Sequence, residues 1–398
     1  MFEVVILQST LKIALDYLAP TVGKNSQNLG DDCISLEATD VGSCILYTTN
    51  TIESSVLEVV CSNATKAATA PYVNFKRFKG IIDSIPANEY VTIKEGVNQL
   101  LISFSMRKTP IIINADNNGM IAKPAIISSL PTDMAEIPVS FFNSIITKAN
   151  SIIKESVTTQ IMNCVKLTIG NPSVTAEAID VTSKRTFMMT DSFGVCNTPQ
   201  TFLIETSKMA KSLKLLEYYT NFEIGSDKAF IVIRGTKPIN SNGNIIDSYY
   251  VLRQLSGTFP NVAQYYGAAY APAEYITVNK NDILNSIARI KAIGDDTSFG
   301  TGITIKADKG EFGVSFNSQY GQLDDPIDVY NGIKGSFGMI FNHKEFEEVL
   351  KNITTDYVDI GLMTGTTSNF IIKPSGSSYT GTDKFTMISR ATQQQQTP

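Results

Sequence analysis

The 398-residue sequence has few of the residues on which catalytic and metal sites are usually built. Its single histidine, His343, stands at a predicted helix start, where such a residue is more often a surface group than a general base. Its five cysteines form no C-x-x-C pair, so neither a disulfide framework nor a zinc site is expected. Gly-Lys-Ser and Gly-Lys-Thr are absent, which argues against a phosphate-binding loop. We therefore predict no catalytic residues, no cofactor and no metal.

Long apolar runs are also lacking. No stretch approaches the roughly 20 apolar residues needed to cross a bilayer, and the N-terminus lacks the basic-then-apolar layout of a signal peptide. We expect a cytoplasmic protein that contacts no membrane. The net charge of −5 shows no basic surplus of the kind usual in DNA-binding proteins, so the distribution of charge matters more than its sum. The length favours two or three domains.

Six amphipathic segments stand out from a background of short β-branched runs, and they occur in pairs. The predicted helices are Gln8–Val22, Tyr72–Ile85, Val139–Lys154, Thr206–Tyr219, Asn279–Ile293 and Asn342–Ile353. Ser140, Thr206, Asn279 and Asn342 are the predicted N-caps. Helix starts within a pair are about 63 to 67 residues apart, and successive pairs are displaced by about 131 and 141 residues. Three copies of one unit explain this spacing.

Strand-like stretches fill the sequence between the helices. In the first copy they are Cys33–Ala38, Ser43–Thr48, Val56–Cys61, Tyr90–Lys94, Leu100–Met106 and Pro110–Asn114. Each copy is therefore predicted to be an α+β domain of two helices backed by antiparallel sheet. The predicted domains are 1–123, 124–270 and 271–398. Linkers are expected near Ala122–Pro131 and Gly267–Ala273, and the Gln-rich tail 391–398 is expected to be disordered.

Positive charge is concentrated in the predicted helices. The helices and their flanks hold fifteen basic and eight acidic residues, whereas the rest of the chain holds 18 basic and 30 acidic residues. Solvated helices are commonly basic, but a basic lining inside an acidic exterior would also attract phosphates. With no recognition helix or basic arm, contact with DNA would be independent of base sequence. The predicted DNA-facing residues are Lys12, Lys24, Lys76, Arg77, Lys79, Lys148, Lys154, Lys208, Lys211, Lys214, Lys280, Arg289 and Lys291.

Several strings resemble the bacterial DNA polymerase III beta subunit family, the sliding clamps. LKIALDYLAPTVG and FKRFKGIIDSIP resemble its first two helices, RQLSGTFPNV its turn closing the second domain, FNHKEFEEVLKNI its last helix, and KFTMISR its terminal strand. Their order and spacing from Phe2 to about Thr392 carry the resemblance. It implies the DNA clamp fold, in which a head-to-tail homodimer forms a ring lined by helices. Such a ring has no catalytic activity and keeps a polymerase on double-stranded DNA by effective concentration.

The resemblance also implies two contact sites. A cleft that binds short peptides of the DNA polymerase and the clamp loader would involve Met162, Val181, Ser183, Lys184, Thr186, Pro260, Tyr265, Ser368, Phe385, Met387, Ile388, Ser389 and Arg390. Met162, Val181 and Phe385 could equally be core residues. Lys184 and Thr186 are more polar than the family pattern, so the recognised motif is expected to differ. The subunit interface would place Ile111 against Ile293. Divergence this broad suggests a bacteriophage or other outlying source.

Two other functions remain open. A structural assembly protein, such as a virion component of repeated α+β domains, would share the low charge and the many Thr, Ser and Asn residues. A metal-dependent nuclease would need clustered carboxylates, for which Asp31–Asp32, Asp295–Asp296 and Asp324–Asp325 are the candidates. All three acidic pairs stand beside Gly or Pro in predicted loops, which is typical of solvated turns.

Overall fold

The computed structural model describes residues 1–23, 30–50, 52–116, 124, 130–153, 160–180, 185–192, 196–227, 229–238, 244–262, 272–293, 303–308, 311–318, 320–331, 337–363, 369–376 and 384–388. The predicted tail and most of both predicted linkers lie outside these ranges. Within them, no helix is both long and apolar enough to span a membrane.

Six α-helices lie within the predicted segments, in three pairs. They are α1 (Gln8–Leu18), α2 (Phe75–Asp83), α3 (Val139–Ile152), α4 (Thr206–Leu216), α5 (Lys280–Ile293) and α6 (His343–Lys351). Each buries one apolar stripe; in α1 this stripe includes Leu11, Leu15 and Leu18, which have no exposed surface. The order of helix, strands, helix and strands occurs three times along the chain, as predicted.

The helix starts confirm two of the predicted N-caps. The Asn342 side chain accepts hydrogen bonds from the backbone N–H groups of Lys344 and Glu345 at 3.1 and 3.4 Å. Asn279 accepts one from the N–H of Asn281 at 2.8 Å. Ser140 and Thr206 are not N-caps but lie within the first turns of α3 and α4.

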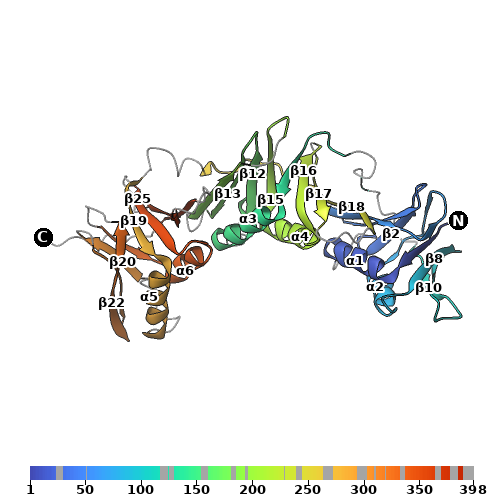
Figure 1. Ribbon diagram of the computed structural model, residues 1–398, viewed down its shortest axis with the longest axis horizontal. Helices are drawn as coiled ribbons and strands as arrows, with labels where there is room; N and C mark the ends of the chain where they lie inside the picture. Colours follow the sequence, from blue (N-terminus) through green and yellow to red (C-terminus); the bar gives the residue numbers. More distant parts are fainter. Residues whose placement is uncertain are drawn as a thin grey trace. The chain divides into compact units, whose positions relative to one another are not determined.

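The chain divides into two compact units, and the first comprises Met1–Phe142, Val195–Gln200 and Ser207–Gln254. It contains two antiparallel sheets. In hydrogen-bonded order, the five-stranded sheet consists of β10 (Ile111–Asn114), β9 (Gln99–Ser103), β8 (Tyr90–Gly96), β1 (Glu3–Leu7) and β5 (Asn63–Ala64). The nine-stranded sheet consists of β11 (Met134–Pro138), β16 (Tyr219–Ser226), β17 (Phe230–Pro238), β18 (Ile245–Arg253), β4 (Glu53–Val60), β3 (Ser43–Thr49), β2 (Cys33–Ala38) and β6 (Ala68–Thr69), with β7 (Val73–Asn74) also paired to β2. Within this unit, α1, α2 and α4 lie on one side of the sheets (Figure 1).

The second unit comprises Asn143–Gly194, Thr201–Thr206 and Leu255–Pro398. Its nine-stranded antiparallel sheet consists of β15 (Gln200–Glu205), β12 (Cys164–Ile169), β13 (Val174–Asp180), β14 (Arg185–Asp191), β27 (Lys384–Ile388), β26 (Asn369–Ser375), β25 (Tyr357–Met363), β19 (Pro272–Asn279) and β23 (Val329–Asn331). Its four-stranded sheet consists of β22 (Gly321–Ile327), β21 (Glu311–Ser318), β20 (Ile303–Asp308) and β24 (Phe337–Phe341). Helices α5 and α6 and most of α3 belong to this unit.

Hydrogen bonding between strands explains why three sequence repeats give two compact units. Strand β4 of the first repeat pairs with β18 of the second, and β14 of the second repeat pairs with β27 of the third. Each nine-stranded sheet is thus continuous across a junction between neighbouring repeats, which we call a seam. Because the compact units follow these sheets, the domain boundaries at 123 and 270 remain a prediction from the repeat spacing.

Candidate nucleic-acid interface

The predicted DNA-facing residues differ widely in exposure and pairing. Lys24 and Lys154 lie outside the described residues. Lys12, Lys76, Arg77 and Lys214 are exposed on α1, α2 and α4, and their side chains make no ion pair with any described residue. The others are paired, bonded to backbone or buried. The described members of this predicted set therefore fall into two groups: exposed cations without an ion pair, and cations that are paired, bonded to backbone or buried.

Lys148 is the clearest departure from the prediction. Its side chain is 5% exposed, and its Nζ lies 3.8 Å from Sδ of Met189. Lys148 follows Ile145 by three residues and precedes Ile152 by four, so it shares the stripe that α3 packs against its sheet. The prediction that Lys148 faces DNA is wrong, because its position on the helix turns it into the protein.

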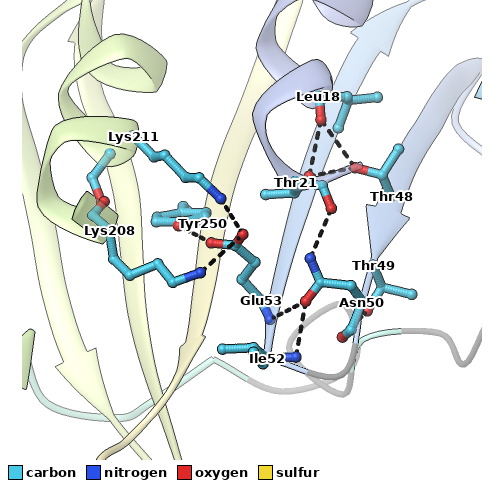
Figure 2. A network of polar contacts seen from close by, with 11 residues as sticks. Leu18, Thr21, Thr48, Thr49, Asn50, Ile52, Glu53, Lys208, Lys211 and Tyr250 are labelled. Atoms are coloured by element: carbon cyan, nitrogen blue, oxygen red, sulfur yellow. Dashed lines mark hydrogen bonds and ion pairs between the residues drawn. The ribbon is translucent and has the colours of Figure 1, made fainter. Parts of the chain in front are cut away.

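The two lysines at the start of α4 bind a buried carboxylate. Glu53 on β4 is 2% exposed at its side chain and forms ion pairs with Lys208 at 3.1 Å and with Lys211. The hydroxyl of Tyr250 on β18 donates a hydrogen bond to the other carboxylate oxygen. Figure 2 shows the carboxylate between the α4 lysines and Tyr250. A residue of the first repeat is thereby joined to a helix and a strand of the second, across the first seam.

Electrostatics at Glu53 favour its charged form. Burial alone would raise the pKa of this carboxyl, but the hydrogen bonds from Lys211 and Tyr250 and the charge of Lys208 hold the pKa below its ordinary value. Asn50 holds the backbone beside this carboxylate, because its side chain accepts hydrogen bonds from the N–H groups of Ile52 and Glu53 and donates one to the carbonyl of Thr21 (Figure 2). Lys208 and Lys211 therefore stabilise the seam, and the one carboxylate that they share offsets half of their combined charge.

A second cluster, with the signs of charge reversed, lies at the other seam. Arg185 on β14 is 1% exposed, and its Nη1 donates to the carbonyl of Ser151 on α3 at 2.8 Å. Its guanidinium lies 3.7 Å from Asp180 and 3.9 Å from both Glu345 and Glu348 of α6. At each seam, a buried charge on a strand meets two opposite charges three residues apart on a helix of the next repeat.

The cations of α5 and α6 are also largely matched. Arg289 pairs with Asp325, which accepts a further hydrogen bond from Ser286 at 2.6 Å. Glu347 is shared by Lys291 and Lys351. Burial opposes ionisation of Asp325 and Glu347, but these partners lower the pKa of both carboxyls. The Lys280 ammonium donates to the carbonyl of Ile353 at 2.6 Å.

The described residues of the predicted partner cleft all belong to the second compact unit. Val181, Ser183, Lys184, Tyr265, Ser368, Ser389 and Arg390 lie outside the described residues. Met162 is half-buried on the short 3-10 helix η3 (Gln160–Asn163), and Pro260 is half-buried. The segments of these two residues touch, because a Cβ added at Gly257 would lie 2.0 Å from Cδ1 of Ile161. Phe385, Met387 and Ile388 are on β27.

Backbone pairing brings two parts of the predicted cleft together. Thr186 is paired with Thr386, and Phe187 with Phe385. Thr186 itself has no exposed surface, and its neighbours Arg185 and Phe187 are equally buried. Strand β14 is thus covered on both faces here, so Thr186 does not line an open cleft, contrary to the prediction. Whether the remaining residues bind a peptide stays a prediction.

The two predicted interface residues lie near the open edges of different sheets. Ile111 is on β10, the edge strand of the five-stranded sheet, where the neighbouring Ile112 is 55% exposed. Ile293 is half-buried at the end of α5. A Cβ at Gly321, the first residue of edge strand β22, would lie 2.8 Å from Cγ2 of Ile293. Both edges present unpaired backbone groups that another strand can complete.

One acidic group has spacing suited to a metal. Asp32, Cys33 and Asp116 offer ligand atoms within 4.8 Å of one another. The Cys33 thiol points toward both carboxylates, and burial together with their charges raises its pKa to about 12. At neutral pH this thiol therefore keeps its proton. Of the predicted acidic pairs, Asp295–Asp296 lies outside the described residues, and Asp325 is engaged by Arg289 and Ser286.

The only histidine is buried rather than on the surface. His343 is the first residue of α6 and is 3% exposed. Its position at a helix start agrees with the sequence, but the expectation of a surface group is wrong, because α6 packs its first turn inward.

Comparison with known proteins assigns the fold. No protein-family model matches the sequence, and no curated protein matches it. Solved structures do match along nearly the whole chain, and the fold they share is that of the DNA sliding clamps. The predicted fold class is confirmed: α+β, with helix pairs backed by antiparallel sheet.

Three of these structures illustrate the likeness. The putative DNA polymerase III beta subunit from Eubacterium rectale has a TM-score of 0.80 at 14% identity, covering 98% of this chain and 99% of that one. The beta subunit from Thermotoga maritima has 0.75 at 16% identity, covering 98% and 100%. The sliding clamp from Pseudomonas aeruginosa bound to griselimycin has 0.77 at 14% identity, covering 98% and 99%. At such identities the likeness establishes the fold alone.

Proposed function

We propose that the protein is a DNA sliding clamp, a processivity factor that encircles duplex DNA and tethers a replicative polymerase. The observation that carries the proposal is the end-to-end match in fold, which leaves almost no part of the Eubacterium rectale chain without a counterpart. Exposed cations on α1, α2 and α4 add support, because a helix-lined hole needs positive charge toward phosphates. The protein needs no catalytic group for this role.

Closure of a ring would use the two open sheet edges. Strand β10 is an edge of the first unit and β22 an edge of the second, so a contact between β10 of one copy and β22 of another would be heterologous. Such a contact can be repeated until the ring closes, and two copies close it in a head-to-tail homodimer. Ile111 and Ile293 would then lie near the junction. A closed ring keeps its polymerase on the template by effective concentration.

A ring is expected to stay on DNA that has no ends and to leave DNA that has them. The protein, with an expected solution mass of twice 43.4 kDa, is incubated with a nicked circular plasmid and separated by gel filtration. We expect it to elute with the circles and to be released when one restriction cut opens them. Blocking both ends of the linear product with bulky proteins should restore retention. Equal retention on open and closed DNA would refute the topological mechanism.

The same experiment separates the rival functions. A structural assembly protein should form its assemblies without DNA and show no difference between circles and linear molecules. A metal-dependent nuclease should degrade the plasmid in magnesium or manganese. Neither the Cys33 thiol, which is protonated, nor Asp325, which is bound by Arg289, favours the nuclease.

The partner groove is proposed beside η3, where Met162 and Pro260 are half-buried. Griselimycin, bound by the Pseudomonas aeruginosa neighbour, is a suitable probe of this site. We expect Met162→Glu to weaken its binding about tenfold or more, because a charge placed in an apolar groove is poorly solvated. Isothermal titration calorimetry measures the change. Glu311→Lys, at an exposed position on β21, should leave binding unchanged; an equal loss in both variants would place the groove elsewhere.

A further inference from the structure

Among the described residues, the exposed helix cations that form no ion pair are concentrated in the first compact unit; in the second unit, the half-buried Lys280 of α5 donates to a backbone carbonyl rather than to a carboxylate. Lys12 on α1, Lys76 and Arg77 on α2, and Lys214 on α4 are all exposed and form no ion pair with any described residue. Arg289 and Lys291 on α5 and Lys351 on α6 are exposed too, but each has a carboxylate partner. The helices of the two units therefore have similar numbers of cations and very different net charges.

The local acids of the first unit do not cancel its free cations. Asp16 on α1 and Asp83 on α2 both bind Lys79, each at 2.8 Å. This one lysine engages both acids and joins α1 to α2, while Lys12, Lys76 and Arg77 stay free around the bridge. Glu217 offsets part of the charge of Lys214, which lies three residues earlier on α4.

The free cations lie on the exposed faces of α1, α2 and α4, and α1 packs against α2. Lys12 precedes Asp16 by four residues and Lys76 precedes Lys79 by three, so both point to the side of the Asp16–Lys79 bridge. The end of α4 lies nearby, since Asp16 acts electrostatically on Tyr218. Helices α1, α2 and α4 also lie on one side of the sheets in Figure 1.

We propose that this surface, made of Lys12, Lys76, Arg77 and Lys214, makes the phosphate contacts to duplex DNA, and that α5 and α6 contribute few. The inference rests on the proposed clamp function and refines it: each subunit holds the duplex from its first unit rather than from all six helices. The occupant is the phosphate backbone, because the four cations form no ion pair with any described residue and so keep their charge for an anionic partner. Contact of this kind releases counterions and depends steeply on salt.

The test compares three double variants that each remove two positive charges. Lys76→Gln with Arg77→Gln removes free cations of α2. Arg289→Gln with Lys291→Gln removes paired cations of α5, and Lys66→Gln with Lys306→Gln removes exposed cations outside the helices. Fluorescence anisotropy of a labelled blunt 30-base-pair duplex, titrated from about 25 to 200 mM salt, gives affinity and salt slope.

We expect the α2 variant to bind about tenfold more weakly at the lowest salt and to have a salt slope smaller by about 2, because each missing cation leaves one phosphate with its counterion. The two control variants should change affinity by less than about threefold, the part due to net charge alone. Glu347→Gln, which frees Lys291 and Lys351, should tighten binding more than Glu311→Gln, which removes one exposed acid that pairs with no described cation.

Each outcome decides the inference. A loss of affinity in the α5 variant equal to that in the α2 variant, or no measurable binding of the duplex by the unmodified protein at low salt, would overturn it. Retention on circular plasmid is measured on the same proteins. If retention persists while the α2 variant binds the duplex normally, only the assignment of the surface fails; if retention itself is absent, the clamp function fails.

Discussion

Replacement of Arg185 by methionine is expected to destabilise the second unit by about 3–5 kcal/mol, the cost typical of removing one partner from a buried ion cluster. Methionine fills similar space, so the change in volume contributes little. Asp180 is 8% exposed and would face an apolar side chain in place of the guanidinium, while the carbonyl of Ser151 would lose its donor. Denaturant unfolding at fixed protein concentration measures the change in stability, and amide exchange of β14 and β27 locates it.

The Arg185 variant has a matched control and a rescue. Arg253→Met removes an exposed arginine at the end of β18 and should change stability by less than about 0.5 kcal/mol. Adding Glu345→Gln and Glu348→Gln to Arg185→Met should restore part of the stability, because two negative charges would no longer lie beside the methionine that replaces their arginine. If the triple variant is as unstable as the single one, the effect comes from packing and the charge argument is wrong.

Periodicity was sufficient to locate the helices and many strands. The stripe of Leu11, Leu15 and Leu18 fixes the buried face of α1, and the β-branched run Cys33–Ala38 coincides with β2. Both signals are local, since they depend on which side of an element meets the core. Helix ends were predicted a few residues too late, as at α1 and α4, because side-chain pattern continues past the last backbone hydrogen bond.

Pairing between distant charges could not be predicted from one sequence. Lys208 and Lys211 look like solvated helix residues, and only the β4–β18 pairing brings Glu53, about 155 residues earlier, beneath them. The same holds for Arg289 and Asp325, whose contact depends on how α5 packs on β22. The burial of Lys148 is an exception and could have been predicted from the sequence, because this lysine occupies a position within an otherwise apolar stripe. The number of cations predicted to face DNA was therefore too high.

Glu53→Gln is expected to cost the first unit about 2–3 kcal/mol, less than the arginine change, because Lys208 and Lys211 can turn toward solvent. Their side chains are 18% and 34% exposed, whereas Arg185 is 1% exposed. Tyr250 is 1% exposed and would have a weaker acceptor in the amide than in the carboxylate. Glu311→Gln, on an exposed strand end, is the control and should change stability by less than about 0.5 kcal/mol.

The same carboxylate gives stability a defined dependence on pH. The pKa of Glu53 is lower in the folded chain than the ordinary 4.5, so in the range between the two values the unfolded chain binds more protons. The stabilisation is complete above the ordinary pKa and disappears as the pH falls through the folded-state pKa. Amide exchange of β4 and β18 from about pH 7 to 3 measures the stability of the first unit. The difference in stability between the native protein and Glu53→Gln should become smaller as the pH falls. A difference that is constant over this range would mean that Glu53 stabilises the seam by its shape and not by its charge.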